Sequence, residues 1–274
     1  MTAASAMTPM TAWAALAAAF QCELRKFARS RVGVLGTAVI AVIAGGILTI
    51  TAGISGALAG GNPALAAKLG PTATPDWLGL LTVVAQITGA GGLLGFGTVL
   101  AWMFAREFAD GTVVGLFALP VSRAQTAAAK LAVYGGWLIV LNALLVMGLL
   151  VLGVLLGHGL PDAAARSGIG RQFLLGLLTG LVALPVAWVA TVSRSLLGGV
   201  STAIGLVVVA QVGVIAGPAG WLPLAAPALW AMGHAAPDGP ITPATTAQLA
   251  VSVTFSLAFA ALTVLAWSRL QLRR

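Results

Sequence analysis

Charged side chains are scarce in this chain: only 7% of its 274 residues are Asp, Glu, Lys or Arg, against roughly a quarter in an average soluble domain. Apolar residues make up 59%, and the mean hydropathy is +1.04. So few charges cannot cover the surface of a water-soluble chain of this size. The composition therefore excludes a soluble globular domain, a disordered tail and a fibrous protein, and it predicts a polytopic membrane protein.

Residue types that form disulfides, bind metals or hold nucleotides are also nearly missing. The single cysteine, Cys22, excludes a disulfide framework and a cysteine-based metal or redox cluster. The two histidines, His158 and His234, lie far apart without ligand spacing. No Gly-x4-Gly-Lys-Ser/Thr phosphate loop is present, so ATP would have to be bound by another chain. We expect no catalytic residue, metal or cofactor here, and no enzymatic activity.

Long apolar runs dominate what is present, and a helix needs about 20 such residues to cross a bilayer. Within hydrocarbon a helix satisfies its own backbone groups, so the sequence predicts an all-α integral membrane fold. The chain divides into a tail with an amphipathic helix at 1–31 and a six-span domain at 32–274. The six expected spans, all free of charge, are 32–54, 78–104, 131–156, 173–192, 196–216 and 249–267. Pro185 is expected to kink the fourth span.

The distribution of basic residues predicts the orientation of these spans. Eleven of the 14 Lys and Arg fall on the side that holds both termini, and only Lys68, Arg166 and Arg171 fall on the other. This bias places both termini in the cytoplasm. The net charge of +8 would suggest nucleic acid in a soluble protein, but these charges flank apolar runs. We therefore expect the lipid bilayer, and not nucleic acid, as a partner.

An amphipathic helix is predicted before the first span. Apolar side chains recur there at steps of three and four, while most of the polar residues fall on other faces. Thr11, or Thr8 followed by Pro9, would start this helix. It could lie in the plane of the membrane interface, or it could pack against the protein itself, and we favour the interfacial position. The apolar positions are Trp13, Leu16, Phe20, Leu24 and Phe27.

Small and polar residues inside the spans suggest how the helices associate. Glycines four apart allow close approach of helices, although 35 glycines also produce such pairs by chance. The span amides Gln86, Asn142 and Gln211 are expected to bond between helices. Because the predicted spans contain no ionisable residue, an ion-coupled carrier is disfavoured. The glycine pairs are Gly91 with Gly95, Gly176 with Gly180, and Gly213 with Gly217.

One cytoplasmic loop, at 105–130, is dense in charges of both signs. Asp110-Gly111 predicts a turn, and the apolar residues of 113–117 can form a short helix that Pro120 ends. Ser122, three residues before Gln125, predicts a capping box that opens the next helix. An apolar helix displayed beside the membrane favours a docking site for a partner, which Glu107, Asp110 and Arg123 could orient. The alternative is an ordinary structured loop.

The same loop resembles the signature of ABC-2 type permeases. The resemblance rests on Glu107-x3-Gly111-Thr112-x7-Pro120-x-Ser122-Arg123, with Lys130 seven residues beyond. Chain length, six spans, cytoplasmic termini and the lead-in helix are similar too, and so is the proline- and tryptophan-bearing segment at 222–230. The likeness is closest to the small permeases of bacitracin- and lantibiotic-exporter type, which implies a bacterial plasma membrane protein.

This resemblance implies a mechanical role. Two permease chains, identical or different, would pair and dock two ATP-binding subunits that carry ATP and magnesium, and the helix at 113–119 would be the coupling helix. The exported substrate would be hydrophobic or amphipathic. The expected docking residues are Glu107, Asp110, Gly111, Thr112, Val113, Phe117, Pro120 and Arg123. The expected extracellular gate is Trp221, Pro223, Pro227 and Trp230.

Two other classes of function remain open from the sequence. A non-transporting membrane anchor or regulator could use the same loop to recruit a cytoplasmic protein. An intramembrane enzyme would need a positioned nucleophile and base, and neither histidine lies in a predicted span. We favour the permease.

Overall fold

The computed structural model describes residues 11–30, 76–116, 121–216, 219–235 and 242–271, together with a few positions between 45 and 74. All the regular structure in these residues is helical, which confirms the all-α prediction for this part of the chain. Five helical segments are long and apolar enough to cross a membrane. The first expected span, 32–54, falls almost wholly outside the described residues, so the count of six stays a prediction.

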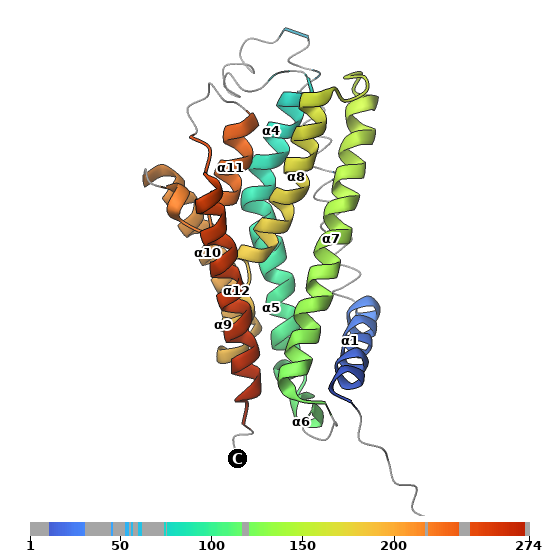
Figure 1. Cartoon of the computed structure of the whole chain (residues 1–274), viewed down its shortest axis with the longest axis vertical. Helices are drawn as coiled ribbons and strands as arrows, with labels where there is room; N and C mark the ends of the chain where they lie inside the picture. The colour runs from blue at the N-terminus through green and yellow to red at the C-terminus, as the bar shows by residue number, and fades with distance from the viewer. Residues whose placement is uncertain are drawn as a thin grey trace, which may run out of the picture.

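The five candidate spans form a bundle of roughly parallel helices (Figure 1). The first of them is continuous from Trp77 to Ala109 but contains one π-helical turn, η1, within a glycine-rich sequence. The elements of the spans are α4 (Trp77–Ile87), η1 (Thr88–Gly92), α5 (Leu93–Ala109), α7 (Arg123–Leu155), α8 (Ala163–Val182), α9 (Pro185–Ser193), α10 (Leu196–Ala216) and α12 (Thr246–Ser268). The shorter elements are α1 (Ala12–Arg29), α6 (Val113–Leu116), η2 (Ala219–Trp221) and α11 (Ala226–Ala235).

Side-chain caps fix where several helices begin. Ser122 opens α7 with the predicted capping box: its hydroxyl accepts from the Gln125 amide at 3.1 Å, and its own amide donates to Gln125 Oε1 at 3.0 Å. Thr245 and Gln248 form the same box at α12. Thr11 caps α1, as one of the two expected starts. These caps satisfy amide groups that the first turn of a helix leaves unpaired.

Pro185 divides the fourth predicted span, as expected. The α-helical bonding of α8 ends at Val182, and α9 starts with Pro185 in its first position. A proline has no amide to donate and clashes with the preceding turn, so it suits a helix start and not a helix interior. At its other end α9 stops at Arg194, which has a left-handed backbone with φ of +53°.

The two ends of the bundle carry different elements (Figure 1). We call the end that holds α6, the start of α7 and the C-terminal end of α12 the α6 end. We call the end near the starts of α4 and α8, where α11 lies, the α11 end. The helix ends and turns at the α6 end hold four arginines: Arg106, Arg123, Arg194 and Arg269. This arrangement follows the charge bias of the sequence, while the side of the membrane on which each end lies stays a prediction.

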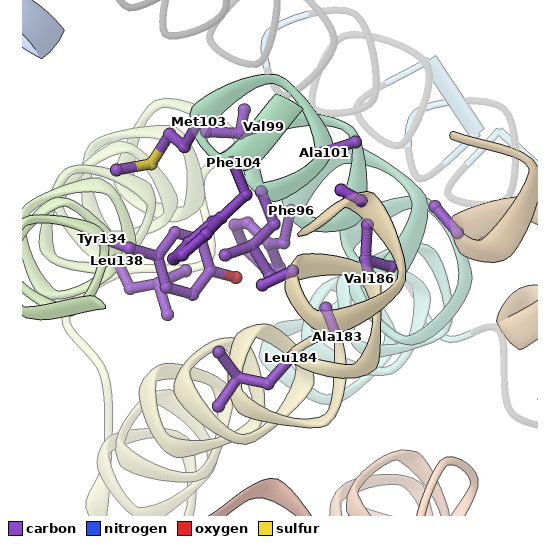
Figure 2. Close-up of a cluster of buried hydrophobic side chains, with 14 of the residues drawn as sticks. Phe96, Val99, Ala101, Met103, Phe104, Tyr134, Leu138, Ala183, Leu184 and Val186 are labelled. Atoms are coloured by element: carbon purple, nitrogen blue, oxygen red, sulfur yellow. The ribbon is translucent and has the colours of Figure 1, made fainter. Parts of the chain in front are cut away.

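An apolar core fills the bundle between α5, α7, α9 and α10. Phe96 and Phe104 of α5 lie beside Tyr134 and Leu138 of α7, with Val186 of α9 on the facing side (Figure 2). Small residues bring α10 against α5. A Cβ built on Gly97 would come within 2.7 Å of the Ala203 Cβ, and one on Gly199 within 2.6 Å of the Ala101 Cβ. Such contacts are a common way for helices to associate in lipid.

Helix α1 lies beside the part of α7 nearest the α6 end (Figure 1). It packs through Ala15, Ala19, Glu23 and Phe27, at steps of four residues. Of the predicted apolar face, only Phe27 is buried, where its ring lies 5.9 Å from that of Trp137. The face that packs on α7 is therefore a different one from the predicted apolar face, and alanines suit it because they allow closer approach than aromatic side chains do. The outward face includes Trp13, Phe20 and Leu24, and its position at a membrane interface stays a prediction.

Candidate functional site

The ends of α5 and α7 carry charge into the bundle. Both helices run beyond the predicted spans 78–104 and 131–156, so Glu107 and Lys130 lie in helical turns and not in a loop. Both side chains point inward, with Glu107 2% exposed and Lys130 1% exposed. Buried charges are stable only when they are paired and hydrogen-bonded. Their partners therefore decide what this end of the bundle can do.

These partners come partly from α1, and together they form what we call the ion cluster: Glu23, Lys26, Glu107 and Lys130. Lys130 Nζ donates to Glu23 Oε2 at 2.7 Å, to Glu107 Oε1 at 2.8 Å and to the Met103 carbonyl at 3.2 Å. Lys26 Nζ donates to Glu23 Oε1 at 2.7 Å and reaches Glu107 Oε1 at 3.5 Å. Two acids and two bases thus join α1, α5 and α7.

Burial and pairing act against each other on the α1 members of the ion cluster. Burial raises the pKa of Glu23, but the charges and hydrogen bonds of Lys130 and Lys26 outweigh it, so the pKa lies below its ordinary value. For Lys26, burial lowers the pKa, while the bond to Glu23 and the two carboxylate charges raise it above the ordinary value. Both groups are charged at neutral pH. Removing one partner would leave the opposite charge buried and unpaired.

The indole of Trp267 continues this network into α12 and α9. Lys130 Nζ lies 5.6 Å from the centre of the Trp267 ring, a favourable arrangement for a cation. The indole Nε1 donates to Thr191 Oγ1 at 3.0 Å, and Phe104 packs edge-on against the ring at 6.0 Å. Trp267 is fully buried. The last turns of α12 are therefore linked to α5, α7 and α9.

Two arginines bind the backbone just beyond α12. Arg123, the first residue of α7, donates from Nη1 to the Leu270 carbonyl, and Arg194 donates from Nη2 to the Gln271 carbonyl at 3.2 Å. These carbonyls follow the end of a helix, where unpaired acceptors favour cationic donors. The left-handed backbone of Arg194 also places its guanidinium 5.9 Å from the Phe108 ring.

The loop expected to dock a partner stands beyond the ion cluster. Asp110 ends α5, and Gly111 has a φ of +68°, which makes the predicted turn. Thr112 is exposed and its carbonyl accepts from the Gly115 amide at 3.0 Å. Val113 packs against the core, and Val114 is 58% exposed. Phe117 and Pro120 lie outside the described residues.

This geometry separates the expected docking residues into two groups. Asp110, Gly111 and Thr112 are exposed, so a partner could touch them. Glu107 faces the interior and Arg123 bonds to the C-terminal segment. The latter two can influence a partner only through the position of the helices that carry them.

The residues expected to form an outer gate belong to η2, α11 and the turn between them. Trp221 is 61% exposed, Pro223 and Trp230 are half-buried, and Pro227 is buried. Helix α11 packs against α4 and α8 near the α11 end (Figure 1). A Cβ on Gly213 of α10 would come within 2.3 Å of Leu222 Cδ2. The segment thus packs against α4, α8, α10 and α12, which belong to four candidate spans.

The other glycines and amides are placed unevenly. A Cβ on Gly176 would overlap Asn142 Oδ1 at 1.6 Å, and one on Gly180 would come within 2.5 Å of Leu138 Cδ1, so α8 lies close to α7 at both. The amide of Asn142 donates to Leu138 in its own helix. Gln86 and Gln211 are exposed. Gly91 has only Ile87 of its own segment near the Cβ position, and Gly217 lies outside the described residues.

Sequence reasoning did not single out Glu23, Lys26, Thr191 or Trp267. Glu23 is 107 positions from Lys130 in sequence, and Thr191 is 76 from Trp267. One signal was available for Glu23, since it is the sole acid in the lead-in helix. A single acidic residue on a helix that otherwise carries basic residues indicates a specific ion pair.

A family match accounts for this combination of spans and loop. Residues 19–212, well over half of the chain, match the family described as ABC-2 family transporter protein. The chain belongs to the ABC-2 transporter family. The match includes the second half of α1, the ion cluster, the loop with α6, the helices from α4 to α9 and most of α10. The comparison with curated proteins found no match.

Membership in the ABC-2 family confirms the resemblance that the loop signature indicated. It gives the chain a coarse role, that of a multi-pass membrane component of a transporter. ABC-2 proteins of this kind form the membrane part and associate with an ATP-binding subunit. The family therefore favours transport over the anchor or regulator alternative.

Proposed function

We propose that this ABC-2 protein is the permease of a bacterial plasma membrane exporter, driven by ATP that a separate subunit hydrolyses. The observation that carries the proposal is the α6 end. There an exposed turn and short helix follow α5, and a buried ion cluster joins the two flanking helices to α1. A push on α6 would move α5 and α7 as one body, because their bases are linked through Lys130.

The proposed mechanism is a change of packing and not a reaction. Binding of nucleotide to two ATP-binding subunits would press on the 110–116 segments of two permease chains. Closely packed helices have discrete arrangements, so such a push would shift the spans between two packings. The α11 end, where η2 and α11 pack against α4, α8, α10 and α12, would open to release the substrate. No catalytic residue of this chain is required.

The proposed substrate is hydrophobic or amphipathic. The described parts of the spans bury aliphatic and aromatic side chains, and their buried charges are those of the ion cluster at one end. A path between such helices suits an apolar body better than a small ion. The sequence resemblance to small permeases of bacitracin- and lantibiotic-exporter type agrees with this class of cargo.

The test is ATP-driven transport in proteoliposomes that contain the chain and a phosphate-loop ATPase subunit that co-purifies with it. Val114→Asp places a charge on the exposed face of α6 and should lower substrate-stimulated ATP turnover by about tenfold, the effect of losing one well-packed interface residue. The matched control is Leu160→Asp, because Leu160 is also exposed and apolar but lies in the turn before α8. It should leave turnover unchanged.

Two outcomes would contradict the proposal. If both variants behave like the unmodified protein, the 110–116 segment is not the docking site. If the assembled pair hydrolyses ATP without moving any apolar or amphipathic substrate, the anchor or regulator interpretation replaces the permease. Glu107 is unsuitable as a docking probe, because its burial means that a substitution would destabilise the protein first.

A further inference from the structure

A shallow hollow of about 550 Å³ lies between α1 and the end of α5. Four cationic side chains line it, three from α1 and Arg106 from α5. Gln21 and Cys22 add polar groups to the wall. The α1 cations are Arg25, Lys26 and Arg29.

Most of this positive charge is unbalanced. Lys26 is paired with acids of the ion cluster, but no carboxylate within salt-bridge distance of Arg25, Arg29 or Arg106 occurs in the described part of the chain. Cations that share one hollow repel one another, and the repulsion falls when an anion enters. The hollow therefore has the charge of an anion site.

The geometry of Arg106 leaves its donors available. Its guanidinium lies over the Trp102 ring, 4.8 Å from the centre, so the flat face is covered by the indole. The N–H groups of a guanidinium project from its edge and match two oxygens of a phosphate at once. Stacking on Trp102 also limits the freedom that this side chain would lose on binding.

We propose that this hollow binds a phosphate group, with Arg25, Arg29 and Arg106 as its ligands. Several guanidinium groups around one space suit a phosphate, which offers more acceptor oxygens than a carboxylate does. The group could belong to an anionic lipid at the membrane surface or to a phosphate in solution. Lys26 belongs to the ion cluster and also lines the hollow, so a bound phosphate would share this lysine with Glu23 and Glu107.

Cys22 provides a reporter inside the hollow, because it is exposed and is the only cysteine of the chain. The experiment measures the rate at which an uncharged maleimide modifies Cys22 in the purified full-length chain in a neutral detergent. The probes are dioctanoyl phosphatidylglycerol, dioctanoyl phosphatidylcholine and inorganic phosphate. We expect at least one of the two anionic probes to slow the modification by about fivefold or more, and phosphatidylcholine to have little effect.

Matched double variants separate a built site from general attraction. Arg25→Gln with Arg29→Gln should raise the concentration needed for protection by about tenfold or more, since each cation contributes about fivefold. Arg166→Gln with Arg171→Gln removes the same charge from α8 at the α11 end and should change nothing. Protection is compared as a ratio within each variant, because nearby arginines also alter the reactivity of the thiol.

Each outcome is decisive. Protection by phosphatidylglycerol alone supports the site with a lipid as its source, and equal protection by inorganic phosphate supports it with a soluble source. The proposal is overturned if neither anion protects Cys22, if phosphatidylcholine protects as well as phosphatidylglycerol, or if both double variants lose protection equally. If the variant with Arg25→Gln and Arg29→Gln fails to fold, the protection of Cys22 is compared between Arg106→Gln and the unmodified chain instead.

Discussion

At the α6 end, three charged side chains join Lys130 in one cluster across three helices, whereas at the α11 end the contacts between the described helices are neutral. There Gln172 of α8 donates to Thr88 Oγ1 at 2.8 Å, and the Trp77 ring fills the space beside Gly153 of α7. A charge cluster breaks all at once, because each member depends on the others. Neutral packing weakens in smaller steps. A charge cluster therefore suits a part of the protein that moves as one unit, and neutral packing suits a surface that opens.

The largest expected effect comes from breaking the ion cluster. Lys130→Met leaves Glu107 and Glu23 buried with only Lys26 between them, and should lower the free energy of unfolding by about 3–5 kcal/mol. The comparison at the other end is Gln172→Met, which removes one neutral hydrogen bond and should cost about 1–2 kcal/mol. Thermal or denaturant unfolding in detergent measures both. Equal losses would show that the two ends do not differ in kind.

Close packing at the α11 end can be tested at Gly153. A Cβ there would lie 2.1 Å from Trp77 Cη2, so Gly153→Ala must displace the indole and should cost about 1–3 kcal/mol. The control is Gly136→Ala in the same helix, where no atom lies within 4 Å of the Cβ position. That variant should be neutral or slightly stabilising. A Gly153→Ala protein as stable as the control would mean that Trp77 does not hold α4 against α7.

A smaller effect is expected from the indole at the edge of the ion cluster. Trp267→Phe removes the hydrogen bond to Thr191 and part of a fully buried ring, and should cost about 1–2 kcal/mol, because the Thr191 hydroxyl still donates to Ala187. The matched control is Trp221→Phe in the exposed η2 segment, which should change stability by less than about 0.5 kcal/mol. If the two substitutions have the same effect, the link between α12 and α9 does not depend on this bond.

The ion cluster also predicts how stability depends on pH. The pKa of Glu23 in the folded protein is below its ordinary value of 4.5, so its contribution is present above pH 4.5 and is lost as the pH falls through the folded value. Lys26, whose pKa is raised, stays charged throughout this range. The difference in Tm between the unmodified protein and Glu23→Gln should therefore shrink on acidification. A difference that is constant down to acid pH would contradict this assignment.

Much of the architecture could be predicted from the sequence because it depends on local signals. Apolar runs indicate the five candidate spans that the structure describes, Pro185 indicates the break between α8 and α9, and Ser122 with Gln125 indicates the start of α7. Each of these signals is contained within a single continuous stretch of sequence.

The candidate site could not be predicted in the same way. Hydropathy places Glu107 and Lys130 outside the spans, since a charge ends an apolar run, although both helices continue past them. Their pairing with Glu23 depends on how α1 lies against α7, which no local pattern encodes. The large side chains of α1 indicate its apolar face, whereas the contact with α7 is made mainly by Ala15 and Ala19, whose small size gives no strong signal.

The π-helical turn η1 makes the two halves of the first described span direct their buried side chains to different sides. One residue beyond the α-helical repeat rotates all that follows by about 100° around the axis. Before η1, α4 turns Leu80 and Val84 inward beside α7 and α8; after it, α5 directs Leu100 and Phe104 into the core with α9 and α10. One continuous helical segment thereby packs against two sets of helices. In an uninterrupted α-helix, the side chains of α4 or those of α5 would point away from the helices they now contact.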